Sequence, residues 1–179
     1  MRTYLDLDPG LKAQIWAHLL QNDLEQVATL FADVRQAGEE ASFVPKHVGL
    51  AVAEDFAVQL PFHVELTGAA RAGIIKRAWD TGTSIVEFHS HPGDSWPAGF
   101  SPSDVHGFSE YVPHCRWRLR GRPYVAVVVS PTGVDALAWL GPEAEPVALD
   151  AIRVAGADNI LPTRRSINQL RAKAFVHGP

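Results

Sequence analysis

The sequence contains a single cysteine, Cys115, in 179 residues. An internal disulfide needs two cysteines and a cysteine-rich metal site needs several, so both are excluded. So few cysteines are typical of proteins that stay in a reducing compartment. The N-terminal stretch "MRTYLDLDPG" also lacks the apolar core of a secretory signal. We therefore expect a cytoplasmic protein.

Long apolar runs and an excess of positive charge are absent as well. The longest strongly apolar run spans residues 124–129, which is far shorter than the roughly 20 residues that cross a bilayer. Sixteen lysines and arginines stand against twenty aspartates and glutamates, so the net charge is −4. A protein that holds nucleic acid through its phosphates is usually basic. We expect neither a membrane nor a nucleic acid as a partner.

The chain shows no internal repeat and has the length of one domain. Leu11, Ile15 and Leu19 recur every four residues and predict a helix, whereas other segments are rich in β-branched and aromatic residues and predict strands. We predict an α/β fold with a mixed sheet and flanking helices. The predicted helices are 9–21, 67–80 and one from residue 101, and the predicted strands are 24–34, two within 42–66, 84–92, 122–130, 134–140 and 147–156, followed by a tail.

The most informative segment is residues 84–104, "SIVEFHSHPGDSWPAGFSPSD". Side chains alternate between faces along a strand, so His89 and His91 point the same way. Pro92 ends the strand, and the chain returns to place Asp104 in the first turn of the next helix. Two imidazoles and one carboxylate form a ligand set that leaves a catalytic zinc one open position for water.

Simpler interpretations exist for each of these residues taken alone. A His-x-His pair without further ligands is more often accidental than metal-binding. Asp104 alone is more often a charge that stabilises a helix N-terminus, with Ser101 as the cap. His106, two residues after Asp104, points to another side of the helix and is not expected to be a ligand. The ordered combination at a strand, a loop and a helix favours a metal site.

The strings HSHP at 89–92 and SPSD at 101–104 resemble the signature of the JAMM (JAB1/MPN/Mov34) metalloproteases. That signature is a glutamate, then His-Ser/Thr-His, a spacer and Ser-x-x-Asp. The resemblance implies a cytidine-deaminase-like JAB/MPN fold over residues 1–145, with 146–179 as a C-terminal strand and tail of the same domain. It also implies one zinc per chain, held by His89, His91 and Asp104. The nine residues between His91 and Ser101 are more than the usual spacer, and this longer loop carries Trp96, which could cover a substrate groove.

The resemblance also implies a glutamate on an early strand that handles protons, and Glu25 in "LEQVATLF" matches that position. A surface acid at a strand start is the alternative interpretation of Glu25. Glu87 is a rival because it shares a strand face with His89, but two residues along one strand place it about 7 Å away, where a residue more often orients an imidazole. Ser101 is expected to serve as the helix cap, as a donor to an oxyanion, or as both.

The function that this resemblance implies is a zinc isopeptidase that cleaves after the C-terminal glycine of a ubiquitin-like protein. Compact prokaryotic members of the family suggest a bacterial conjugation pathway, including antiphage defence, by analogy. One alternative is a family scaffold that binds without catalysis, although its metal ligands would then usually be lost. Another is a DNA-repair branch with a signature like His-Asn-His-Pro, which Ser90 and the acidic net charge disfavour.

Overall fold

Apolar side chains of the central strands alternate between two separate cores. In the strand from Ser84 to Ser90, Val86 and Phe88 belong to one buried cluster, while Ile85 belongs to the other. This alternation follows from the two-residue period of a strand and requires both faces of the sheet to be covered. The computed structural model describes residues 1–93, 95–141 and 145–176.

The described elements run in the order β1 (Arg2–Leu7), α1 (Pro9–Leu19), β2 (Val27–Ala37), β3 (Glu40–Leu50), the 3₁₀ turn η1 (Ala53–Asp55), β4 (Phe56–Leu60), β5 (His63–Leu66), α2 (Gly68–Thr81), β6 (Ser84–Ser90), α3 (Pro102–Arg118), β7 (Tyr124–Ser130), β8 (Gly133–Trp139), β9 (Val147–Ala148), β10 (Ala151–Val154) and α4 (Arg165–Val176). Eight strands form one mixed sheet in the order β10-β1-β3-β2-β6-β7-β8-β9. β4 and β5 form a separate two-stranded hairpin.

The large sheet is curled, because its two edge strands are neighbours in the chain. β9 pairs with β8 at one edge, and β10 pairs with β1 at the other. Leu149 and Asp150 alone join β9 to β10, so the two edges must come close together. Asp150 ties this corner to β1, since its carboxylate accepts a hydrogen bond from the backbone N–H of Thr3 at 2.7 Å.

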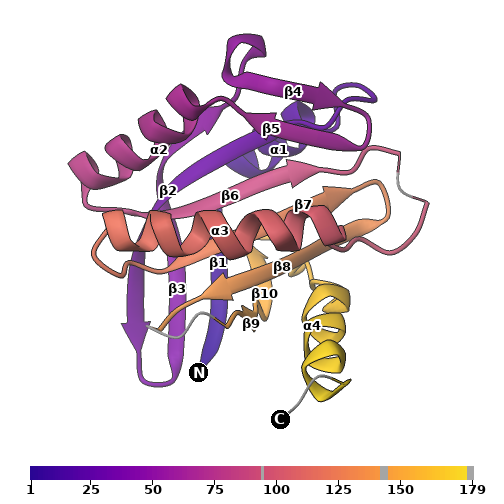
Figure 1. Ribbon diagram of the computed structural model, residues 1–179. Coiled ribbons are helices and arrows are strands. Elements are labelled where there is room, and N and C mark those ends of the chain that lie inside the picture. The colour runs from indigo at the N-terminus through magenta and orange to yellow at the C-terminus, as the bar shows by residue number, and fades with distance from the viewer. Residues whose placement is uncertain (94, 142–144, 177–179) are drawn as a thin grey trace.

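Helices cover both faces of the sheet. α1 packs Ile15 and Leu19 into the core on one face. α2 and α3 lie side by side over the other face, where Ile75, Phe108 and Val112 are buried (Figure 1). No helix in the described part of the chain combines the length and the apolar character that crossing a bilayer requires.

The predicted mixed α/β architecture is confirmed, and each predicted helix and strand has a counterpart in the structure. Four regions differ from the prediction. The N-terminal strand β1 was not predicted, and the region 42–66 holds three strands instead of two. The single strand predicted over 147–156 is two short strands, β9 and β10, and the expected tail contains the helix α4. β1 is stabilised by β3 and β10, which lie far away in the sequence, so no local pattern identifies it. The segment 146–179 supplies two strands to the main sheet as well as α4.

Candidate metal centre

The two histidines lie at the end of the central strand β6. β2 pairs with β6 on one side, with Val27 opposite His89, and β7 pairs with it on the other. His91 follows the last residue of the strand, and its backbone N–H donates to the carbonyl oxygen of Val129 at 2.8 Å. His89 and His91 are only 4% and 9% exposed. Backbone pairing therefore fixes the backbone from which the two imidazoles extend.

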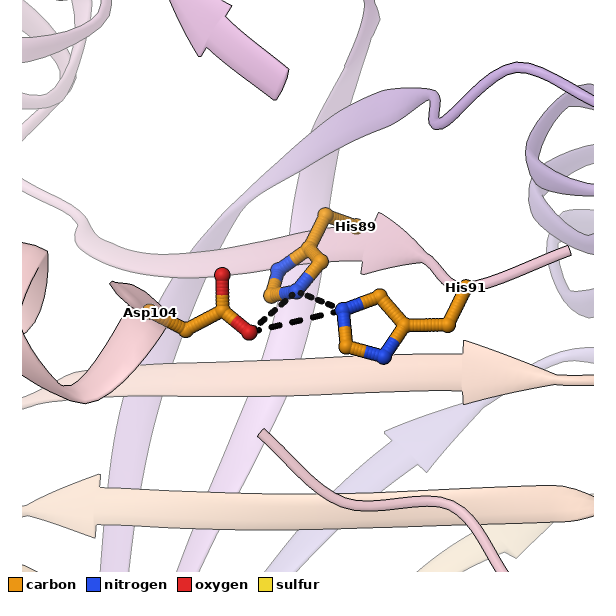
Figure 2. A group of neighbouring side chains, drawn as sticks. All are labelled: His89, His91 and Asp104. Carbon is orange, nitrogen blue, oxygen red and sulfur yellow. Dashed lines mark hydrogen bonds and ion pairs between the residues drawn. The ribbon is translucent and has the colours of Figure 1, made fainter. Parts of the chain in front are cut away.

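The predicted ligands His89, His91 and Asp104 converge on one point (Figure 2). The Nε2 atoms of the two histidines are 3.2 Å apart. Asp104 Oδ2 lies 3.5 Å from Nε2 of His89 and 3.4 Å from Nε2 of His91. Ligands bonded at 2.0–2.1 Å to a tetrahedral ion are about 3.3 Å from one another. The three donor atoms thus have the spacing that one small divalent ion requires.

Asp104 is held in place by the N-terminal cap of α3. Ser101 Oγ accepts a hydrogen bond from the backbone N–H of Asp104 at 3.1 Å, and Asp104 Oδ2 accepts one from the backbone N–H of Ser101 at 2.7 Å. This reciprocal pair is a capping box, and Pro102 begins the helix. Burial by itself would raise the pKa of Asp104, but His89 and His91 outweigh it and hold that pKa well below its usual range. The carboxylate is therefore ionised and oriented.

Glu25 approaches His91 from the segment before β2, the strand that pairs with β6. It lies just before β2, is 3% exposed, and places Oε1 3.6 Å from Nε2 of His91. Its backbone N–H donates to the carbonyl oxygen of Leu60 at 3.0 Å, and its carbonyl oxygen accepts from the Gln59 side chain at 3.0 Å. The hairpin β4–β5 thus holds both the backbone N–H and the backbone carbonyl group of Glu25. The alternative of a surface acid is wrong.

The pKa of Glu25 is raised above its ordinary value, and burial is the main cause. The nearby His89 and His91 oppose this effect by favouring the charged form. A carboxylate with a raised pKa holds a proton more firmly than an ordinary glutamate does, which is the property of a group that accepts and later returns a proton.

Glu87 has a different partner. Its side chain accepts a hydrogen bond from the hydroxyl of Tyr124 at 2.8 Å. That bond directs the carboxylate toward β7, where Tyr124 begins the strand. Of the two candidate glutamates, Glu25 is therefore the one that contacts a predicted ligand. His106 faces Glu110, with 3.8 Å between Nε2 and Oε1, and is not in the ligand group.

Ser90, between the two histidines, has a role that sequence reasoning missed. It is fully buried, and its Oγ accepts a hydrogen bond from the backbone N–H of Gln26 at 2.9 Å. Its own backbone N–H donates to the carbonyl oxygen of Gln26 at 3.1 Å. Ser90 therefore ties the segment that carries Glu25 to the strand that carries the histidines. A hydroxyl side chain at the end of a largely buried strand was the signal that could have revealed this link.

We expect Ser90→Ala to leave the N–H of Gln26 buried without an acceptor, which costs about 1–3 kcal/mol. The free energy of unfolding, measured by urea denaturation of metal-free protein, should fall by that amount. Ser109→Ala, on the exposed side of α3, is the control and should change it by less than about 0.5 kcal/mol. Equal stability of the two variants would show that this hydrogen bond does not hold the Glu25 segment.

The loop between His91 and Ser101 is anchored at several points within its described part. The hydroxyl of Thr132 donates to the carbonyl oxygen of Trp96, and that of Thr163 donates to the carbonyl oxygen of Ala98, both at 2.6 Å. The Trp96 residue is 70% exposed and is not among the residues that line the cleft beside the metal centre. A role for Trp96 in substrate binding stays a prediction. Asp94 lies outside the described residues.

A cleft of about 410 Å³ adjoins the metal centre. Residues 63–66 of β5 line one side of the cleft, and α3 from Ser103 to His114 lines the other. Glu87 and His89 of β6 also line it. Among the described strands, β5 pairs with β4 alone. Its other edge is therefore open to an extended peptide.

Cys115 is excluded as a nucleophile by its surroundings. The side chain is fully buried in the core under α3, and burial raises the pKa of its thiol to about 12. At pH 8 such a thiol contains about 10³ times less thiolate than one with an ordinary pKa. We expect a disulfide reagent such as Ellman's reagent to modify Cys115 rapidly only after unfolding in guanidinium chloride. Rapid modification of the native protein would contradict this burial.

Comparisons with known proteins leave the family of the chain unassigned. No protein-family description matches the sequence, and no curated protein matches it. Among solved structures, the chain is similar to the solution structure of protein DSY2949 from Desulfitobacterium hafniense. The identity is 17%, the TM-score is 0.46, and the match covers 84% of this chain and 90% of that one.

Proposed function

We propose that the protein is a zinc-dependent isopeptidase of the JAMM type, with the cytidine-deaminase-like JAB/MPN fold that this family implies. One observation carries the proposal. Three donor atoms from His89, His91 and Asp104 have the spacing of tetrahedral ligands. The buried carboxylate of Glu25 lies 3.6 Å from Nε2 of His91. Such a set leaves room for water and for a base beside it.

The chemistry is hydrolysis of an amide. A zinc ion held by the three ligands would polarise the carbonyl group and lower the pKa of a water molecule beside it. Glu25 accepts the proton of the attacking water and later gives it to the leaving amine. Ser101, at the cap of α3, donates its hydroxyl hydrogen to the oxygen that becomes negatively charged. Burial of Glu25 supports this role, because its raised pKa lets it carry the proton between the two steps.

The cleft supports an extended substrate segment. An extended chain could pair with the open edge of β5 and lie against α3, so that a carbonyl group reaches the metal ligands. The tip of the neighbouring hairpin exposes Leu60 and Phe62, which are 42% and 79% exposed. A folded protein could bind this apolar tip while its C-terminal tail enters the cleft. Glycine next to the cut leaves space for such a close approach, and a ubiquitin-like protein has this combination of a folded body and a flexible tail.

A cleavage assay tests the proposal. The substrate is ubiquitin whose C-terminal glycine is joined to the ε-amine of a lysine in a fluorescent peptide. We expect cleavage at that amide, loss of activity with 1,10-phenanthroline and recovery on addition of zinc. Substrate in which valine replaces the last glycine should not be cleaved. Cleavage of unstructured peptides without regard to glycine would indicate a general peptidase, and binding without cleavage would indicate a scaffold.

A further inference from the structure

A second cavity lies between α2 and the C-terminal half of α3. Its volume is about 560 Å³, which is within the range of ligand pockets. We call it the tryptophan pocket and define it by the lining residues Ile75, Lys76, Trp79, Trp117, Arg118 and Arg120. Arg118 is fourteen residues after Asp104 on α3, which places it about 21 Å along the helix from the metal centre. His114, nearer to Asp104, lines both this pocket and the cleft beside the metal centre.

Two large aromatic side chains of this pocket are exposed to solvent. Trp79 is 44% exposed and Trp117 is 72% exposed. Each has a guanidinium group over its ring, with Arg120 at 4.8 Å from the centroid of Trp79 and Arg118 at 5.7 Å from that of Trp117. A guanidinium group near an aromatic ring at these distances makes a cation–π contact, which does not use its N–H groups as a carboxylate does. The pocket therefore combines apolar surface with hydrogen-bond donors.

The charge of the pocket is positive although the net charge of the whole chain is −4. Lys76 forms an ion pair with Asp80, one turn away on α2. Among the described residues, no carboxylate forms an ion pair with Arg118 or Arg120. Two arginines that form no ion pair with a described carboxylate, beside exposed tryptophans, favour an acidic ligand.

Arg120 adopts a backbone conformation that normally favours glycine. It follows the end of α3 with a φ of 56°, which is in the left-handed region that costs free energy for a residue with a side chain. Glycine is the usual residue at this position after a helix. Termination of the helix therefore does not favour arginine at position 120. The contact of the Arg120 guanidinium with the ring of Trp79 does favour it.

We propose that the tryptophan pocket binds an acidic peptide segment of a protein partner. The carboxylates of that segment pair with Arg118 and Arg120, and an apolar side chain packs between the two indoles. A nucleic acid fits less well, because the three cations of the pocket are few for a polyanion that is bound along its phosphates. The proposal does not require a metal or an enzymatic activity.

Nuclear magnetic resonance of the indole N–H groups tests this site directly, because the five tryptophans give five signals. The probe is the pentapeptide acetyl-Glu-Asp-Phe-Glu-Asp-amide, and the matched control has Gln and Asn in place of Glu and Asp. We expect the acidic peptide to shift the signals of Trp79 and Trp117. Trp96 is exposed to a similar degree, at 70%, but lies outside the pocket. Its signal should not move.

A double variant, Arg118→Gln with Arg120→Gly, should weaken binding of the acidic peptide at least tenfold. Its fold should be intact, because glycine suits the left-handed position better than arginine does. The proposal is wrong if neither Trp79 nor Trp117 shifts with peptide up to about 5 mM, a concentration that detects even weak affinity. It is also wrong if the neutral peptide acts equally, if Trp96 shifts to the same extent, or if octathymidylate binds more tightly than the acidic peptide.

Discussion

Glu25→Gln should lower the turnover of the isopeptidase substrate by about 10²- to 10⁴-fold, which is the usual contribution of a general acid–base group. Glutamine keeps the size of the side chain but cannot accept the proton of the attacking water. The variant should still bind zinc, because Glu25 is outside the group of three ligands. Turnover and zinc content, measured on the same preparation, separate these two effects.

Glu87→Gln is the matched control. The amide oxygen of glutamine can still accept the hydrogen bond that the hydroxyl of Tyr124 donates at 2.8 Å to the carboxylate. We therefore expect turnover within a few-fold of the unsubstituted protein. A larger loss of turnover in Glu87→Gln than in Glu25→Gln would transfer the role of the base to Glu87.

Glu25→Gln should also change the stability of the metal-free protein. Burial raises the pKa of Glu25 in the folded state above its value in the unfolded chain. Ionised Glu25 therefore destabilises the folded state at a pH above the folded pKa, and this cost disappears below the unfolded pKa. Denaturation of metal-free protein should show that the variant is more stable at neutral pH, with the difference vanishing as the pH falls through the acidic range. A variant that is less stable at neutral pH would contradict the raised pKa.

Asp104→Asn should weaken zinc binding by more than about 10²-fold, since even the loss of an outer hydrogen bond to a ligand costs 10- to 100-fold. Asparagine lacks the negative charge that a divalent ion favours. Its side-chain oxygen can still accept the bond that the backbone N–H of Ser101 donates to Asp104, so α3 should form normally. Competition with a chromogenic chelator measures the affinity, and circular dichroism checks the helix.

Ser103→Ala, in the same first turn of α3, is the control for this substitution. Ser103 is exposed and is not part of the ligand group. The zinc affinity of the Ser103→Ala variant should equal that of the unsubstituted protein. If Asp104→Asn also retains full affinity, Asp104 acts as a helix cap alone and the ligand set is wrong.

The three ligands could be predicted from the sequence because local geometry brings them together. His89 lies in β6 and His91 directly follows this strand, so the two residues are close in space, and Asp104 lies in the first turn of α3, which Pro102 begins. Glu25 is different. Contacts with Leu60 and Gln59, more than thirty residues away in the chain, bury it and fix its backbone. No pattern near Glu25 contains that information, and only the family resemblance identified the residue.

The contacts of the C-terminal segment also could not be predicted from local sequence patterns. Predicted as a tail, it instead supports the loop that leads to Ser101. Ser166 accepts a hydrogen bond from the backbone N–H of Phe100 at 2.8 Å, and its own N–H donates to the fully buried Asp135 at 2.8 Å. These partners lie in distant parts of the sequence. Neither helix periodicity nor charge pattern therefore predicts that residues 163–166 contact the loop between His91 and Ser101.

The central claim is that His89, His91 and Asp104 hold one zinc ion. Elemental analysis of protein purified without a polyhistidine tag tests it most directly, with His89→Ala/His91→Ala compared against His106→Ala/His114→Ala. Both control histidines are exposed on α3 and lie outside the ligand group. We predict one zinc per chain in the unsubstituted protein and in the control, and none in the His89/His91 variant. Stoichiometric zinc in the His89/His91 variant would contradict the site.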